Sequence, residues 1–188
     1  YRTWWAILSY VILFSIVAFL YNRLRVKQER KKAEDSRKQE ELEAARDFQL
    51  RMLPEKMPNR EGLDIAAKQI TSAEVGGDYY DFFATDDDHL TVVCGDATGH
   101  GTASGMMVSV TKSALQALEG GSPEIVMAEL NRVVKSMNLG TLRMSLTVLN
   151  LENEKVKLAS GAMPPVYVYR KLNQVVDEYL TGDMPLGA

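Results

Sequence analysis

The sequence has few of the residues on which disulfide frameworks and many active sites depend. Its 188 residues include one cysteine, Cys94, and two histidines, His89 and His100. A single cysteine excludes a disulfide within the chain, and its position in an apolar run predicts a packed thiol in a reducing compartment. No serine, cysteine or histidine stands in a recognisable nucleophile arrangement. The net charge of -3 provides no general basic field, so nucleic acid is not an expected partner.

Charged side chains are absent from Trp4 to Tyr21. This run is long enough to cross a bilayer as a helix, and aromatic residues cluster at both of its ends. A secretory signal peptide is disfavoured, because small residues for cleavage are missing and the basic cluster follows the apolar run. By the positive-inside rule, that cluster predicts that the C-terminal side lies in the cytoplasm. It consists of Arg23, Arg25, Lys27, Arg30, Lys31 and Lys32.

Glycine and proline are absent from 22 to about 52, and Glu, Lys, Arg, Ala and Gln are abundant there, which predicts a helix. Leu42, Ala45, Gln49 and Met52 have the a and d spacing of a short parallel seam between two chains, whereas the same register upstream is polar. Two interpretations stay open. The segment is either a solvated helix that spaces a domain from the membrane, or a signalling helix whose two-chain packing changes with input.

Two acidic residues follow glycines in tight turns. Asp78 lies in Val-Gly-Gly-Asp-Tyr-Tyr-Asp (75–81), and Asp96 lies in Cys-Gly-Asp-Ala-Thr-Gly-His-Gly (94–101). The runs 79–84 and 90–95 are typical of two strands joined in a hairpin by the polar turn 86–89. The start of the first strand and the end of the second then share one end of the sheet, so the carboxylates converge. A hard divalent cation such as Mg²⁺ or Mn²⁺ would relieve their repulsion, and a role in capping turns is the alternative.

The remaining pattern predicts an α+β fold with a mostly antiparallel sheet. Strands are expected at 63–67, 143–151, 156–160, 166–170 and 175–180. A helix is expected at 102–118, with a buried face made of Met106, Val110, Ala114 and Leu118. A second helix should begin with Ser122 as N-cap and Pro123 at its first position. Its expected buried face contains Ile125, Leu130, Val133, Val134 and Met137.

The two acidic motifs together resemble those of the metal-dependent serine/threonine phosphatases of the PPM (PP2C-like) superfamily, in particular the bacterial SpoIIE/RsbU branch. Further landmarks of that branch resemble segments within residues 42–188: Ala45-Arg46 with Gln49, Leu53-Pro54, Pro164-Pro165 and Pro185-Leu186-Gly187. The resemblance implies a PP2C-like two-sheet β-sandwich flanked by helices. It also implies two Mn²⁺ or Mg²⁺ ions that activate a water molecule for attack on phosphorus.

The resemblance also implies roles for individual residues. Asp96 would bridge the metals, the backbone carbonyl of Ala97 would contact one of them, and Asp78 would complete the near side directly or through water. Asp81 is either a ligand, a group that supports the ligands, or a residue of a structural turn. His100 is either a general acid or a loop histidine whose flanking glycines shape the turn.

The expected domain order is an extracytoplasmic end (1–3), a transmembrane helix (4–21), a helical linker (22–53) and a phosphatase domain (54–188). Residues 1–5 resemble the junction between periplasmic triple-tyrosine sensor domains and their membrane helix, which implies a truncated sensor. The family's remaining metal-binding aspartates come after the Pro-Leu-Gly landmark, so the domain is expected to lack its C-terminal part. This fragment is therefore expected to bind metal weakly and to hydrolyse little. Residues 161–165 read Gly-Ala-Met-Pro-Pro where relatives commonly have Gly-His-Pro-Pro.

With the membrane span, the resemblance implies a protein phosphatase tethered to the bacterial cytoplasmic membrane, with its domain in the cytoplasm. Its substrate would be a phosphoserine or phosphothreonine on a small regulator such as an anti-sigma-factor antagonist, and two copies would pair through the linker helix. The alternative is a catalytically inactive module that dimerises or binds a partner. A sensor histidine kinase is disfavoured, because the linker holds no histidine and residues 95–101 match no nucleotide-binding loop.

Overall fold

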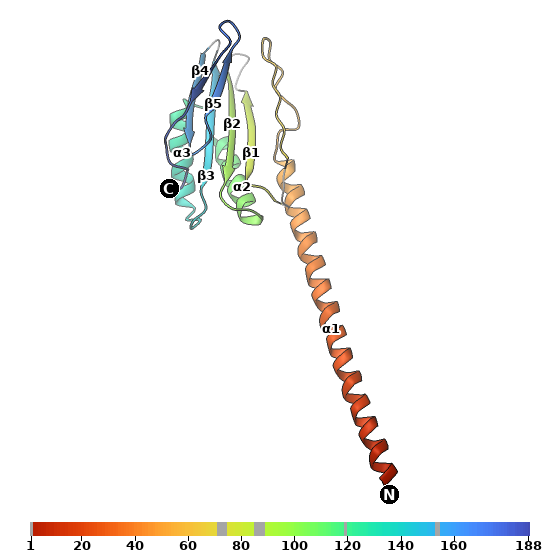
Figure 1. The fold of residues 1–188 in the computed structure, drawn as a ribbon. Coiled ribbons are helices and arrows are strands. Elements are labelled where there is room, and N and C mark those ends of the chain that lie inside the picture. The colour runs from red at the N-terminus through yellow and green to blue at the C-terminus, as the bar shows by residue number, and fades with distance from the viewer. Residues whose placement is uncertain (1, 71–74, 85–88, 119, 153–154) are drawn as a thin grey trace. The chain divides into compact units, whose positions relative to one another are not determined.

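The protein is described by a computed structural model that covers residues 2–70, 75–84, 89–118, 120–152 and 155–188. These residues form a long helix, a four-stranded sheet with two helices, and a two-stranded sheet (Figure 1). Contacts divide the chain into two units, Tyr1–Glu41 and Leu42–Ala188. The boundary between the units falls inside the predicted linker.

The helix α1 (Arg2–Arg51) makes up the described part of the first unit and continues into the second. Its length follows from the sequence, because no glycine or proline interrupts residues 2–51. Every described side chain from Trp4 to Glu41 is exposed. Ion pairs one turn apart support the charged half, namely Arg25–Glu29, Lys38–Glu34 and Arg37–Glu41. The helix predicted from 22 to about 52 is confirmed, whereas Tyr1 lies outside the described residues.

The second unit is built on an antiparallel sheet whose strands follow one another in chain order. They are β1 (Asp78–Ala84), β2 (His89–Ala97), β3 (Met144–Glu152) and β4 (Lys155–Gly161). All four strands lie where the sequence predicted them, and β1 and β2 pair as the predicted hairpin. The predicted turn 86–89 falls on residues outside the described part, apart from His89.

Two helices, α2 (Thr102–Ala117) and α3 (Pro123–Ser136), connect β2 to β3 and cover one face of this sheet (Figure 1). Side chains alternate between the two faces of a strand, so every second residue points toward the helices. These residues form the core with the buried faces of the helices. The core includes Tyr79, Val93, Met144, Leu146 and Val148 from the sheet and Met107, Val108, Leu130 and Val134 from the helices.

The buried face of α2 is rotated relative to the expectation. Met106, predicted to be buried, is 63% exposed. Gly105 explains the rotation, because a β-carbon there would lie only 2.9 Å from Cγ1 of Val75, so this side of the helix packs under the loop that precedes β1. The buried residues of α2 are Ser104, Gly105, Met107, Val108, Thr111 and Leu115.

The start of α3 agrees with the sequence, since Ser122 is its N-cap and Pro123 its first residue. Its buried face agrees only in part. Leu130 and Val134 are buried as predicted, together with Val126. Ile125 and Met137 are exposed, because they lie on the flanks of this stripe and not at its centre.

A separate antiparallel pair is formed by β5 (Val166–Arg170) and β6 (Val175–Tyr179), as predicted. It is tied to the main sheet through the segment that follows it, where the amide of Ala162 donates to the carbonyl of Asp183 at 3.0 Å. The two-sheet α+β architecture therefore agrees with the expected fold class.

The strand predicted at 63–67 is wrong. Among the described residues, this segment forms only an isolated bridge between Arg60 and Leu63. The backbone N–H and C=O groups of a strand must bond to a neighbouring strand. Strands β5 and β6 do not serve as that neighbour, because within the described part of the chain they pair only with each other.

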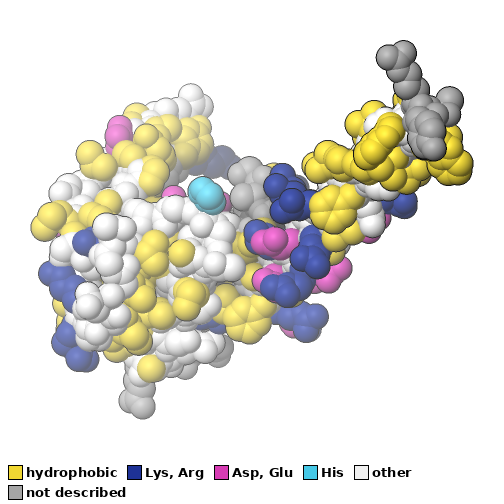
Figure 2. Space-filling model, turned by 90° about the horizontal axis from the view of Figure 1, so that it is seen from below, with side chains coloured by type: hydrophobic (Ala, Val, Ile, Leu, Met, Phe, Trp, Pro, Cys, Tyr) yellow, Lys and Arg dark blue, Asp and Glu magenta, His cyan; other side chains and the backbone are white. Residues whose placement is uncertain are grey.

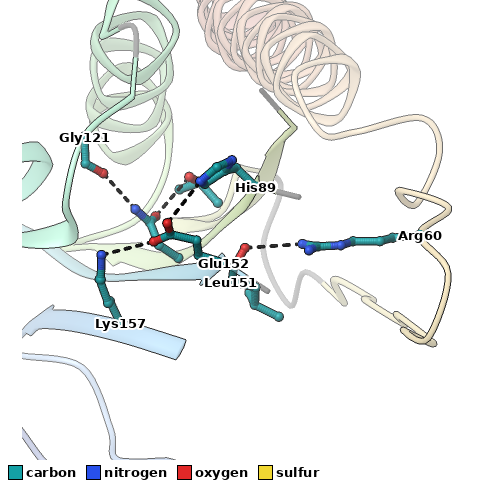
Figure 3. A network of polar contacts seen from close by, with 8 residues as sticks. Arg60, His89, Gly121, Leu151, Glu152 and Lys157 are labelled. Atoms are coloured by element: carbon teal, nitrogen blue, oxygen red, sulfur yellow. Dashed lines mark hydrogen bonds and ion pairs between the residues drawn. The ribbon is translucent and has the colours of Figure 1, made fainter. Parts of the chain in front are cut away.

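A polar network lies at the end of the sheet where β2 begins (Figure 3). His89 pairs across the sheet with Glu152, and its Nε2 lies 3.3 Å from the carboxylate, which also accepts from Lys157 Nζ at 3.1 Å. Arg60 donates to the carbonyl of Leu151 at 3.2 Å. This network lies at the opposite end of β2 from Asp96.

Candidate active site

Asp78 and Asp96 are direct partners in the antiparallel pairing of β1 with β2. Residues opposite each other in such a pair share one face of the sheet and hold their β-carbons about 4.5–5.5 Å apart. This face points away from α2 and α3, because the adjacent residues Tyr79 and Ala97 are buried in the core under the helices. The structure therefore brings together the two carboxylates that the sequence predicted to converge.

The two carboxylates affect each other and the thiol beside them. Desolvation raises the pKa of Asp96, and the negative charge of Asp78 raises it further. Desolvation raises the pKa of the Cys94 thiol, and the negative charges of Asp78 and Asp96 raise it further. Cys94 is exposed, so the prediction of a packed thiol is wrong. The reason is strand alternation, which buries Val93 under the helices and turns Cys94 to the open face.

Gly77 lets two loops approach closely at this point. A β-carbon on Gly77 would lie 2.3 Å from the carbonyl oxygen of Ala97 and 2.6 Å from Oδ1 of Asp96. The amide of Ala97 donates to the carbonyl of Gly77 at 2.9 Å. A side chain at position 77 would collide with these oxygens of the second motif, so only glycine fits here.

The donor atoms at this point fit a hard divalent cation. Two carboxylates and a backbone carbonyl, from Asp78, Asp96 and Ala97, are the oxygen ligands that Mg²⁺ and Mn²⁺ prefer. Within the described ranges, no group of three or more histidine, cysteine, aspartate or glutamate side chains is arranged so that it could hold a metal ion. The described residues thus offer two side-chain ligands and one backbone ligand.

A pocket of about 360 Å³ opens over the two carboxylates. Its walls come from the segment before the first motif, from the open face of the sheet and from the residues that follow β4. Gln69 in the first of these walls donates from Nε2 to the carbonyl of Asp78 at 3.2 Å. Lys68 is the one basic residue among the described residues of the lining, which also includes Ile70, Tyr80, Cys94, Ser145, Met163 and Pro164.

Asp81 is not brought together with this pair. It lies within β1, three residues after Asp78, and strand alternation turns its carboxylate toward α2. There it is 4% exposed, pairs with Lys112 and accepts hydrogen bonds from the Tyr79 hydroxyl and the Phe82 amide, both at 2.9 Å. Its predicted place in a structural turn is therefore wrong, and a role as a metal ligand or as a group that supports the ligands stays a prediction. Burial, followed by the charge of Asp81, raises the pKa of Tyr79.

His100 is exposed in the loop between β2 and α2. The glycines on both sides adopt positive φ angles, 89° at Gly99 and 78° at Gly101, which favour glycine. The amide of Gly101 donates to the carbonyl of Val75 at 3.1 Å, so this loop is attached to the first motif. The geometry favours the interpretation in which the flanking glycines shape the turn.

Gln49 belongs to the site's support, although the sequence suggested a seam between two chains. Its side chain is 3% exposed and binds both backbone groups of Gly76, donating from Nε2 to the carbonyl at 2.7 Å and accepting from the amide at 3.1 Å. Ser104 also donates to the Gly76 carbonyl, at 3.3 Å. Met52 of the same spacing packs on the domain core. Gln49 is polar, whereas the other residues at this a and d spacing are apolar, and this difference was the sequence signal for its role.

Comparisons with known proteins show the family of this domain. A family model described as Stage II sporulation protein E (SpoIIE) matches residues 86–188. The chain is 29% identical over 142 residues to phosphoserine phosphatase RsbU of Bacillus subtilis, covering 73% of this chain and 42% of RsbU. It is 34% identical over 80 residues to protein IcfG of Synechocystis, covering 43% of this chain and 13% of IcfG. The chain thus spans less than half the length of these curated relatives.

Two solved structures share the fold. The SiaA-PP2C domain of Pseudomonas aeruginosa matches with a TM-score of 0.61 and 18% identity, covering 84% of this chain and 64% of that domain. The RsbU and RsbW domains of a Mycobacterium tuberculosis protein match with a TM-score of 0.53 and 24% identity, covering 65% of this chain and 34% of that one. The family match covers more than half of this chain, and the chain has the fold of PP2C domains. The chain therefore belongs to the SpoIIE family of PP2C-type phosphatase domains.

Proposed function

We propose that the protein is a membrane-tethered, metal-dependent phosphatase that hydrolyses phosphoserine or phosphothreonine on a cytoplasmic regulatory protein. The pairing of Asp78 with Asp96 across β1 and β2 is the observation that carries this proposal. The name of RsbU, a phosphoserine phosphatase, supports the reaction class. An anti-sigma-factor antagonist is the substrate that the family resemblance favours.

The proposed cofactor is Mn²⁺ or Mg²⁺, held by Asp78, Asp96 and the carbonyl of Ala97, with two ions expected in the complete domain. When bound, such ions make water a strong nucleophile at neutral pH and neutralise charge on the phosphoester. The chain itself holds the ligands in place, because Gln49 and Gln69 fix the backbone on either side of Gly77. Lys68 supplies a positive charge in the pocket that receives the phosphate.

The proposed tether is the first part of α1. By length and composition this helix can cross a membrane, and its apolar side chains are exposed. We assign residues 1–3 to the extracytoplasmic side, 4–21 to the span, 22–53 to the linker and 54–188 to the phosphatase domain. The basic residues after the span support a cytoplasmic phosphatase domain.

The proposed function is tested by following phosphate release from a phosphoserine protein with the complete cytoplasmic region of the protein in Mn²⁺, in EDTA, and with Asp96→Asn. We expect Mn²⁺-dependent turnover that is lost in EDTA and lowered at least about 100-fold by the substitution, since even residues that only support a metal ligand contribute about 10–100-fold. Asp64→Asn, a change at an exposed position, is the matched control and should retain activity. Equal turnover in Mn²⁺, in EDTA and with Asp96→Asn would refute the phosphatase assignment.

The alternative is a catalytically inactive module that dimerises or binds a partner. The described residues bring together two carboxylates and no larger group of metal-binding side chains. This alternative predicts no turnover with either metal, together with self-association through α1 in sedimentation experiments. Turnover that requires Asp96 would exclude it.

A further inference from the structure

Four basic side chains form a stripe along one side of α1, directly after its apolar segment. At 100° per residue, Arg23, Lys27 and Arg30 fall within an arc of roughly 60°, and Lys31 borders it. These four residues are called the basic stripe here. Figure 2 shows the change along this helix from apolar side chains to charged ones. Phe19 and Val26 line the same surface groove as Arg23, Lys27 and Arg30.

The stripe residues differ from other basic residues of α1 in their surroundings. Arg25, on the opposite side of the helix, pairs with Glu29. Further along, Arg37 and Lys38 pair with Glu41 and Glu34. Among the described residues, no acidic side chain forms an ion pair with a member of the stripe, and all four members are exposed. Glu34 lies on the same side of the helix, one turn after Arg30, but it pairs with Lys38. The stripe therefore presents basic side chains that are not held in ion pairs by other described residues.

The position of the stripe along the helix places it at a membrane surface. This step depends on the proposed membrane span. With a rise of about 1.5 Å per residue, Arg23, Lys27 and Arg30 lie roughly 3, 9 and 13 Å beyond Tyr21. The headgroup region occupies roughly the first 5–7 Å beyond the hydrocarbon, and electrostatic attraction extends about 8–10 Å further. Arg37 and Lys38, at roughly 24 Å or more, lie beyond this range.

We propose that the basic stripe binds anionic phospholipid headgroups and thereby sets the tilt and rotation of α1 in the membrane. Each basic residue close to an anionic surface strengthens association about fivefold. A tilted helix brings one of its sides closer to the surface than the other, and tilts of about 20° are usual. The side that gains most is the one with the basic stripe, where Phe19, on the membrane side of Tyr21, can also contact the upper acyl chains.

The test uses the full chain in phosphatidylcholine vesicles that contain spin-labelled phosphatidylglycerol or, separately, spin-labelled phosphatidylcholine. The lipid fraction immobilised by the protein is read from the electron paramagnetic resonance spectrum. We expect a several-fold preference for phosphatidylglycerol at low salt, which disappears at about 1 M salt, where the screening length is about 3 Å. K27Q/R30Q should remove most of the preference. R37Q/K38Q, which changes the net charge equally, should leave it intact.

Equal immobilisation of both lipids by the unsubstituted chain would overturn the proposal, as would an equal loss of preference in the two double variants. Extraction of the vesicles with alkaline carbonate separates this result from a failure of the proposed tether. A chain that resists extraction but shows no lipid preference overturns the lipid site alone. A chain that is extracted overturns the membrane span and the lipid site with it, and leaves the phosphatase assignment untouched.

Discussion

Asp96 and Asp78 carry like charges on directly opposed strand residues. Desolvation raises the pKa of Asp96, and repulsion by Asp78 raises it further. A neutral side chain of the same shape would relieve this repulsion. We expect Asp96→Asn to raise the melting temperature in EDTA by roughly 1–3 °C, a small change because the carboxylate is largely open to solvent. Mn²⁺ at about 100 times its Kd should raise the melting temperature of the unsubstituted protein by about 5 °C or more, and should not stabilise the variant.

Differential scanning fluorimetry in detergent measures both effects. Asp64→Asn removes the same charge at an exposed position and should leave the Mn²⁺ shift unchanged. If Mn²⁺ stabilises Asp96→Asn as much as the unsubstituted chain, Asp96 is not a metal ligand.

Lys68 is the second residue whose role follows from its position in the pocket over the two carboxylates. A charge-assisted contact to phosphate contributes about 1.5 kcal/mol or more, which corresponds to about tenfold in affinity. We expect Lys68→Ala to raise KM for a phosphoprotein about tenfold with a smaller effect on kcat, and Lys68→Arg to restore most of it. Steady-state kinetics test this role, with Lys56→Ala, a substitution at an exposed position, as the control. A similar KM for the two alanine variants would remove Lys68 from substrate binding.

At the scale of elements, local sequence patterns predicted the strands, whereas features that depend on contacts between distant parts of the chain were missed. The strands β1 to β6 were predictable because alternating and apolar runs between turn residues are local signals. The buried faces of α2 and α3 were predicted only in part. For α2 the reason is that Gly105 packs under Val75, a contact between distant parts of the chain. The strand expected at 63–67 failed for the same reason. Its residues are suitable for a strand, but a strand exists only where a neighbour is available.

The contacts of Glu152 on β3 with Lys157 on β4 and His89 on β2 give a prediction at this scale (Figure 3). The hydrogen bond from Lys157, followed by that from His89, lowers the pKa of Glu152 from its ordinary value of 4.5. A lowered pKa means that the ionised carboxylate stabilises the fold above this value and that its contribution is lost as the pH falls through the folded-state pKa.

Glu152→Gln should therefore lower the melting temperature slightly at neutral pH, because exposed ion pairs contribute little. The difference from the unsubstituted protein should vanish once the pH falls below the folded-state pKa of Glu152, where both side chains are neutral. Thermal melts across the acid range measure it, and Glu178→Gln on the exposed β5–β6 pair serves as control. A difference that stays constant from neutral to acid pH would show that the carboxylate charge does not stabilise these strands.

At the scale of the whole molecule, the sequence predicted only the parts of the candidate site that lie within its two acidic motifs. The convergence of Asp78 and Asp96 followed from two turns and one hairpin, all within about twenty residues of sequence. Gln49 lies 27 residues before Gly76, and its hydrogen bonds to both backbone groups of that residue have no local signature. Asp81 was misplaced because its motif does not show which face of β1 it occupies. The exposure of Cys94 was missed for the same reason, within β2.

Gln49 connects the end of α1 to the loop that positions Asp78, and this connection is testable. Gln49→Leu keeps the size of the side chain but leaves the Gly76 amide unpaired and its carbonyl with the weaker contact from Ser104. Each unpaired buried group costs about 1–3 kcal/mol, so the loop should lose its fixed position. We expect the Mn²⁺ concentration for half-maximal activity to rise about tenfold, as when other residues that support metal ligands are removed.

The Gln49 variants separate this positioning role from simple packing. Gln49→Glu still accepts from the Gly76 amide but cannot donate to the carbonyl, so its Mn²⁺ requirement should fall between those of the unsubstituted protein and Gln49→Leu. Gln116→Leu makes the same chemical change on the exposed side of α2 and should leave the requirement unaltered. A packing role alone would lower the melting temperature of Gln49→Leu without changing the metal concentration that the remaining folded protein needs. Because the loop carries Asp78, we expect instead that the metal requirement changes even at temperatures where the variant is fully folded.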